Sequence, residues 1–350
     1  MGTLKFTNEV IKSDFPELWK YLESGDVTDI DFNCGNLWIS TISEIPHKAE
    51  DAEIDEKYMR RFSIAAGKSV NCNFNPKEHT ACAETENLRI TCVHESQSRS
   101  GISVCIRKFA YGLRRTRAEL IEAGYCTEEI MNMIDNSNRS GRSLFICGLP
   151  GHGKTESMKI WASAIPKHEK VVTIQDVGEI NYSCINEGAS CSELKVINGN
   201  YKECQETALR MNPQHILYGE SRGSDAVYLL ECHSNGIPLM TTLHTNDARN
   251  VTDRILNMLN DRRDSERIVN QLYNDMGMSI LVKRKADQHG KVIRYIDQVC
   301  FYARKDNENI LALAVENGVL HKERIPAFIR EDIEKNTGCG LFQKMRCADE

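Results

Sequence analysis

One stretch of the sequence decides the fold, and it reads Gly148-Leu149-Pro150-Gly151-His152-Gly153-Lys154-Thr155. It matches the pattern G-x-x-x-x-G-K-[ST], which forms a phosphate-binding loop when it lies between a strand and a helix. Glycines allow the backbone to fold closely around a phosphate, and the loop amides supply partial positive charge. Lys154 is expected to reach the β and γ phosphates, and Thr155 is expected to offer its hydroxyl to Mg²⁺. We therefore predict that these eight residues and Glu156 bind a nucleoside triphosphate.

The residues around this loop show the periodicity of an α/β domain. From Arg142 onward, short apolar runs of strand type alternate with helical runs. The predicted strands are 143–147, 170–175, 215–218 and 237–243, and the predicted helices are 154–164, 204–211, 224–232 and 247–259. Strands separated by helices indicate a mostly parallel sheet, whose functional residues gather at the carboxyl ends of the strands.

The length of the chain indicates more than one domain, because 350 residues exceed what one hydrophobic core usually serves. The first hundred residues predict a smaller α+β domain with a mixed sheet. Its expected strands are 29–32, 36–40, 88–93 and 102–106, and its expected helix is 55–66. A charged segment that closes in a polar cluster follows. We predict an N-terminal domain in residues 1–108, a linker in 109–139 and a nucleotide-binding domain in 140–350.

Charge and composition argue against several classes of protein. The chain has 44 basic and 50 acidic residues, and its formal net charge of −6 argues against direct nucleic-acid binding. No uncharged run approaches the roughly 18 apolar residues of a membrane span. The acidic Glu9 comes before any long apolar run, so no secretory signal is expected. The 14 cysteines are scattered singly and are expected to be free thiols. The sequence therefore predicts a cytoplasmic protein.

Acidic and histidine residues follow three of the predicted strands. Glu220 follows the third strand, in the position expected of a Walker B acid that holds Mg²⁺. Asp176 and Glu179 follow the second strand, where a carboxylate can orient water or accept its proton, although Asp176 could instead cap the next turn. His244 follows the fourth strand and is expected to sense the γ-phosphate. These side chains are expected to lie near the phosphate loop.

Five segments together resemble a known family, the hexameric secretion or traffic ATPases of type II and type IV secretion systems and type IV pili. They are GLPGHGKT, the acidic box TIQDVGEI, the segment LRMNPQHILYGESRG, the histidine box TTLHTNDA and the closing strands ILVKRKADQHGKVIRYID. The N-terminal segments GNLWIS and GISVCIRK make the chain most similar to the small ATPase of conjugative type IV secretion machines. The resemblance covers about residues 28–300.

This resemblance implies a RecA-like P-loop NTPase core that works in a ring, with ATP and Mg²⁺ between the N-terminal domain and the core. It gives Glu220 the Walker B role and His244 the histidine-box role. Arginines that complete the site in such enzymes match Arg107, Arg210 and Arg222. An arginine finger contributes about 10³ to 10⁵ in rate, whereas a surface ion pair contributes at most about 1 kcal/mol to stability.

The sequence departs from the family pattern at two places. Gln175 stands where the family usually has a glutamate, and an amide can orient a water molecule but cannot take its proton. Catalysis by Glu179 or Glu220 is therefore our hypothesis. Asn235-Gly236-Ile237-Pro238 stands where a Thr-Gly-His motif is usual. This second departure concerns the subgroup rather than the superfamily.

The resemblance implies an ATP-hydrolysing homohexameric motor of a type IV secretion or conjugation apparatus. Such a motor would lie peripherally on the cytoplasmic face of the bacterial inner membrane, in contact with secretion-channel components. A type IV pilus assembly or retraction ATPase would share the chemistry. An ATP-binding scaffold with little hydrolysis is a further alternative, motivated by Gln175. A helicase or packaging motor would need a basic channel, and the net charge argues against it.

Overall fold

The structure is a computed structural model that describes residues 6–50, 53–220, 232, 235–259 and 264–344. The chain divides into two compact units. The first unit comprises Met1–Ala110 and Ala286–Val292, and the second comprises Tyr111–Lys285 and Ile293–Glu350.

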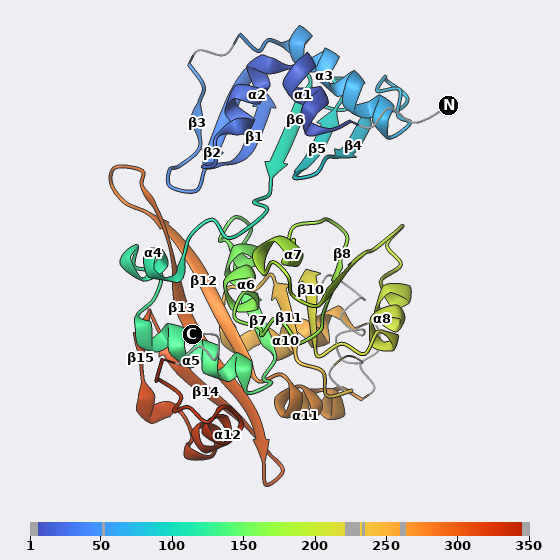
Figure 1. The fold of residues 1–350 in the computed structure, drawn as a ribbon. Coiled ribbons are helices and arrows are strands. Elements are labelled where there is room, and N and C mark those ends of the chain that lie inside the picture. The colour runs from blue at the N-terminus through green and yellow to red at the C-terminus, as the bar shows by residue number, and fades with distance from the viewer. Residues whose placement is uncertain (1–5, 51–52, 221–231, 233–234, 260–263, 345–350) are drawn as a thin grey trace. The chain divides into compact units, whose positions relative to one another are not determined.

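In the first unit, helices pack against an antiparallel sheet (Figure 1). The helices are α1 (Asn8–Asp14), α2 (Pro16–Glu23) and α3 (Glu56–Ser69). The strands are β1 (Val27–Asn33), β2 (Asn36–Thr41), β3 (His47–Lys48), β4 (Thr80–Glu84), β5 (Leu88–Val93) and β6 (Ser103–Lys108), in the order β3-β2-β1-β6-β5-β4. Every neighbouring pair is antiparallel, so the expectation of a mixed sheet is wrong. The reason is that several successive strands are joined by turns too short for a parallel crossover.

The second unit is built around a nine-stranded sheet with the order β15-β14-β13-β12-β7-β11-β10-β8-β9 (Figure 1). The strands are β7 (Leu144–Cys147), β8 (Val171–Gln175), β9 (Cys191–Lys195), β10 (His215–Glu220), β11 (Leu239–Leu243), β12 (Met278–Ala286), β13 (Val292–Lys305), β14 (Glu308–Glu316) and β15 (Val319–Leu320). The neighbours from β12 to β9 all pair in parallel. The predicted α/β architecture is confirmed.

The helices of the second unit connect and cover these strands. They are α4 (Arg117–Glu122), α5 (Glu128–Arg139), α6 (Lys154–Ala162), α7 (Tyr182–Ile185), α8 (Tyr201–Arg210), α10 (Val251–Met258), α11 (Ser265–Asp275) and α12 (Ala327–Thr337), with the 3₁₀ turns η2 (Ala248–Asn250) and η3 (Lys322–Arg324). The central strands β7, β8 and β11 are buried at every position, which explains why they appear in the sequence as unbroken apolar runs.

Several sequence expectations differ from the structure in detail. The segment expected to be a linker contains α4 and α5, and α5 buries Ile130, Met133 and Ile134 in the core of the second unit. Its apolar residues lie on one helical face, which a linker would not require. The helix expected at 247–259 is divided into η2 and α10. The helix expected at 224–232 lies outside the described residues except for Cys232.

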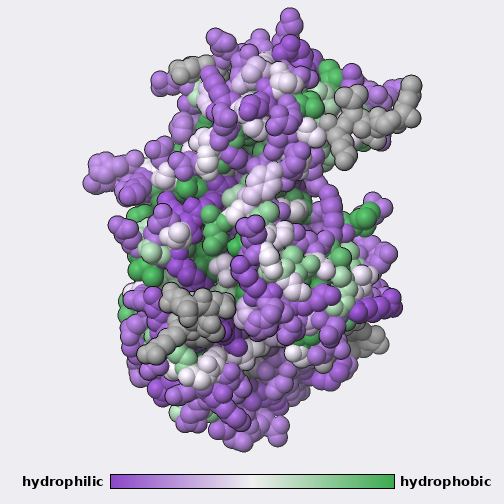
Figure 2. Space-filling model, viewed as in Figure 1, coloured by the Kyte–Doolittle hydropathy of each residue, from purple (hydrophilic) through white to green (hydrophobic). Residues whose placement is uncertain are grey.

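The described helices include none that is both long enough and apolar enough to cross a membrane. In Figure 2 the visible surface is mostly hydrophilic, and apolar side chains occur in scattered groups. Such scattered groups are ordinary on protein surfaces.

Candidate active site

Four parallel strands of the second unit end at one edge of its sheet. β7, β11, β10 and β8 are successive neighbours, and each pair is parallel. The phosphate loop follows β7, His244 follows β11, Glu220 ends β10 and Gln175 ends β8. Because the carboxyl ends of neighbouring parallel strands lie at the same edge, the sheet brings the predicted residues together.

The glycines of the loop adopt backbone conformations that other residues rarely adopt. φ is +153° at Gly148, +75° at Gly151 and +85° at Gly153. A Cβ atom at Gly148 would lie 2.7 Å from the carbonyl oxygen of Val282 on β12. Gly153 is the N-cap of α6, so the loop leads directly into a helix N-terminus, where free amides and the helix dipole favour a phosphate. The loop therefore has the shape and the polarity of a phosphate cradle.

Lys154, His244 and Glu220 form a chain of contacts beside this cradle. The Lys154 ammonium lies 3.2 Å from His244 Nδ1 and donates to the carbonyl oxygen of Leu149 at 3.3 Å. His244 Nε2 forms a close contact with Glu220 Oε1. Because an ammonium can only donate, this arrangement fits the tautomer that carries its proton on Nε2 and donates it to the carboxylate. The charge of Lys154 is thus held next to the loop, on a side chain that is buried.

The acidic box lies against the start of α6. The hydroxyl of Thr155 donates to Glu179 Oε2 at 3.2 Å. Gln175 Oε1 accepts hydrogen bonds from the amides of Glu179 and Ile180, both at 3.1 Å. The side-chain oxygen of Gln175 therefore shapes the turn that carries Glu179.

Asp176 and Glu156 use their carboxylates for local contacts. Asp176 Oδ1 accepts a hydrogen bond from the Val177 amide at 2.9 Å, which fits the alternative that this residue caps the turn. Glu156 Oε1 lies 3.0 Å from Lys159 Nζ and 3.9 Å from Arg114 Nε. The structure therefore directs the carboxylate of Glu156 toward basic side chains.

Of the three predicted arginines, the two in the described part of the chain, Arg107 and Arg210, lie away from these contacts. Arg107 belongs to the first unit, where its Nε lies 2.9 Å from Asp29 Oδ1 across the β1–β6 pair. Arg210 is exposed at the end of α8, before β10 begins, and so lies at the opposite end of β10 from Glu220. Arg222 lies outside the described residues. The role of an arginine from another subunit stays a prediction.

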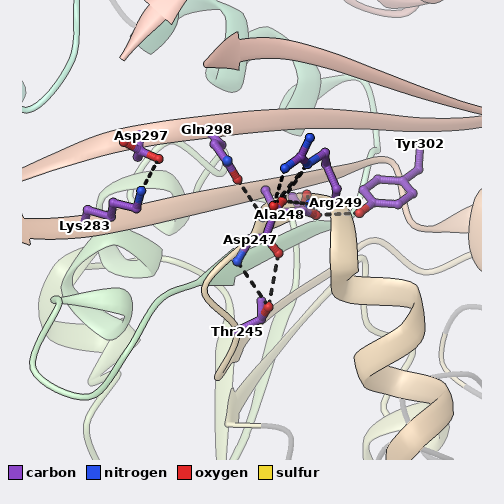
Figure 3. A network of polar contacts seen from close by, with 9 residues as sticks. Thr245, Asp247, Ala248, Arg249, Lys283, Asp297, Gln298 and Tyr302 are labelled. Carbon is purple, nitrogen blue, oxygen red and sulfur yellow. Dashed lines mark hydrogen bonds and ion pairs between the residues drawn. The ribbon is translucent and has the colours of Figure 1, made fainter. Parts of the chain in front are cut away.

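A polar network fixes the histidine box to β12 and β13. The hydroxyls of Ser279 and Tyr302 donate to the carbonyl oxygen of Ala248, at 2.8 Å and 2.5 Å. The amide of Ala248 donates to Gln298 Oε1 at 2.9 Å. Figure 3 shows Gln298 and Tyr302 reaching Ala248 from β13. Sequence reasoning missed these residues, because a serine, a glutamine or a tyrosine within a strand belongs to no motif.

The oxygen ligands at this site fit a nucleoside triphosphate bound with Mg²⁺. Thr155, Glu179 and Glu220 offer the hard oxygen ligands that Mg²⁺ prefers. In the described part of the chain, no group of three or more histidine, cysteine or acidic side chains could hold a metal ion by itself. Mg²⁺ commonly takes one or two protein ligands and completes its shell with phosphate oxygens and water. These residues therefore suit an ion that binds together with the nucleotide.

Comparison with known proteins identifies the family. Residues 83–307 match the family model described as Type II/IV secretion system protein. The chain belongs to this family. An uncharacterized protein of Bacillus anthracis is 25% identical over 310 residues, which are 84% of this chain and 69% of that protein. The type IV secretion system protein VirB11 of Bartonella quintana is 28% identical over 134 residues, which are 37% of either chain. The match thus spans little more than a third of this VirB11.

A solved structure supports the fold of this secretion-family chain. The ATPase DotB of Yersinia pseudotuberculosis has a TM-score of 0.64 at 14% identity, over 87% of this chain and 81% of that chain. The chain has the fold of a secretion ATPase, with a RecA-like core and an N-terminal domain.

Proposed function

We propose that this secretion-family protein is an ATPase that powers a bacterial type IV secretion or conjugation apparatus. The observation that carries the proposal is the chain of contacts from Lys154 through His244 to Glu220 beside a phosphate cradle. The similarity to VirB11, a type IV secretion system protein, and to the ATPase DotB supports the same reading.

In the proposed reaction, the oxygen of a water molecule bonds to the γ-phosphorus of ATP. The bond from that phosphorus to the β–γ bridging oxygen breaks, and its electron pair leaves with ADP. Lys154 exchanges its contacts with His244 and Leu149 for phosphate oxygens and offsets the negative charge that develops there. Glu220 or Glu179 accepts the proton of the water. Mg²⁺, held by Thr155 and Glu220, would neutralise charge on the β and γ phosphates.

The proposal includes assembly as a homohexamer, because an arginine of a neighbouring subunit would complete the site. Arg210 suits such a role, since it is exposed and lies at the far end of β10 from its own Glu220. The ring would lie on the cytoplasmic face of the inner membrane and contact the secretion channel. We expect ATP turnover per subunit to rise with protein concentration as the ring assembles. Light scattering measures the assembly in the same samples. Undiminished turnover by a monomer would contradict this part of the proposal.

Phosphate release by the purified chain tests the central claim. Lys154→Ala should lower the rate by about 10² to 10³, the loss expected when one preorganised charged contact to the transition state is removed. Lys202→Ala is the matched control, because Lys202 is an exposed lysine on α8 and should leave the rate unchanged. Wild-type release no greater than that of Lys154→Ala would instead favour an ATP-binding scaffold.

The machine that the ATPase serves needs a separate experiment. The tagged full chain should co-purify with components of a conjugation channel from its native cells. Co-purification with pilus platform proteins instead would favour the pilus motor and leave the ATPase proposal intact.

A further inference from the structure

Arginine side chains surround the phosphate loop on the side of β12 and β13. Arg294 Nη2 on β13 donates to the carbonyl oxygen of Gly151 at 3.4 Å. A Cβ atom at Gly153 would lie only 3.0 Å from Arg294 Cδ, so the stem of this arginine packs directly on the loop. Arg284 on β12 lies next to the same loop, with its Nη1 3.8 Å from the position of a Cβ atom at Gly151.

Like charges accumulate at this place. Burial lowers the pKa of Arg294, and the charges of Arg284, Arg114 and Arg115 lower it further, whereas Glu156 acts in the opposite direction. Arg114 lies 3.9 Å from Glu156 and has a largely buried side chain. Holding a partly buried guanidinium group near other positive charges costs free energy in the folded protein, and such arrangements are typical of sites that bind an anion.

The sheet order determines which part of a nucleotide these arginines face. β7 carries the phosphate loop, and β11 and β10 lie on one side of it with His244 and Glu220. β12 and β13 lie on the other side (Figure 1). Lys154 reaches the β and γ phosphates in such loops, and here it points to His244. In a nucleotide bound with its β and γ phosphates at Lys154, the γ-phosphate would lie toward β11, and the α-phosphate and ribose would lie toward the arginines.

We propose that Arg294, flanked by Arg284 and Arg114, forms an arginine wall that binds the α-phosphate end of the nucleotide. This inference rests on the proposed function, because it concerns the same nucleotide. The wall binds what ATP and ADP share, whereas His244 faces the γ-phosphate that only ATP carries. Arg294 and His244 therefore have separable effects on the two nucleotides.

Nucleotide titrations of the full chain by calorimetry, with ATP and with ADP, test the wall. Arg294→Ala should weaken the binding of both nucleotides by similar factors, roughly ten- to a hundredfold, as expected for a lost charge-assisted contact. His244→Ala should weaken ATP binding more than ADP binding. Arg304→Ala is the matched control, because Arg304 is on the same strand but contacts Asn270 and Asn309 instead. It should leave both affinities unchanged.

Salt dependence separates a phosphate contact from mere support of the loop. The affinity of the wild-type chain for ADP should fall as added salt screens the arginines, and Arg294→Ala should reduce this dependence. Arg294→Lys should recover part of the affinity, because the charge returns without the guanidinium fork. Arg284→Ala serves as a second variant should Arg294→Ala fold poorly, and it should show the same pattern in weaker form.

The outcomes distinguish the two proposals. If Arg294→Ala and Arg284→Ala both bind ADP with wild-type affinity, or if they lose affinity for ATP alone, the arginine wall is refuted and the proposed ATPase activity is unaffected. A wild-type chain that binds neither ATP nor ADP overturns the proposed function and the wall together.

Discussion

The hydroxyl of Tyr302 gives a sharp test of the network that holds the histidine box. Tyr302→Phe removes one donor to the Ala248 carbonyl and keeps the buried ring in place. That carbonyl retains the hydroxyl of Ser279, 2.8 Å away, and phenylalanine brings no polar atom of its own. We therefore expect the net cost of a single hydrogen bond, about 1 kcal/mol, rather than the larger cost of an unsatisfied buried group. For a domain of 150–250 residues this corresponds to a fall in Tm of about 2–4 °C.

The double variant sharpens this prediction. Adding Ser279→Ala to Tyr302→Phe removes both side-chain donors from one carbonyl, so the combined loss should exceed the sum of the single losses by about 0.5–3 kcal/mol. Thermal unfolding of the nucleotide-free chain measures the stabilities, with Tyr295→Phe on the same strand as the control. ATP turnover should fall with little change in KM, because His244 precedes Ala248 in the same histidine box. Strict additivity, or a Tyr302→Phe shift no larger than that of the control, would refute the reasoning.

Three further perturbations test the loop, the acids and the effect of pH. Gly148→Ala should destabilise the chain by roughly 1–3 kcal/mol and weaken nucleotide binding, because φ is +153° at this position and the new Cβ would lie 2.7 Å from the Val282 carbonyl oxygen. A calorimetric titration in which this variant binds ADP with wild-type affinity would contradict this expectation. One of Glu220→Gln and Glu179→Gln should lower kcat for phosphate release by about 10² to 10⁴, and full turnover by both would exclude either as the base. Burial lowers the pKa of His152, so below about pH 6.5 the imidazole binds a proton more readily in the unfolded chain than in the folded chain, and the stability of the folded chain should fall on acidification. The Tm of His152→Gln, measured between about pH 5 and 7, should depend on pH less than the Tm of the wild-type chain.

The central strands could be predicted because of where they lie. β7, β8 and β11 are buried on both faces, and each therefore appears as an unbroken apolar run. β9, with the sequence Cys191–Lys195, was missed because it is an edge strand whose residues are exposed or half-buried, so no apolar run marks it. The same cause hid β4 at the edge of the first sheet, where alanines take the buried positions.

Only those residues of the candidate site that belong to sequence motifs could be predicted to lie together. Lys154, Glu220 and His244 each follow or end a strand in a motif of fixed order, and the parallel sheet then brings them together. Arg294 and Tyr302 come from a strand more than a hundred residues beyond the loop along the chain. Their proximity depends on β12 and β13 joining the sheet beside β7, which periodicity cannot indicate.

The position of Gln175 changes how an atypical acidic box should be interpreted. Its side-chain oxygen accepts hydrogen bonds from two successive backbone amides, and the side-chain oxygen of a glutamate could accept the same hydrogen bonds. The absence of an acid at position 175 is therefore compatible with the turn that carries Glu179. The variant Gln175→Glu is therefore expected to keep the turn that carries Glu179, because a carboxylate oxygen can accept the same two amide hydrogen bonds.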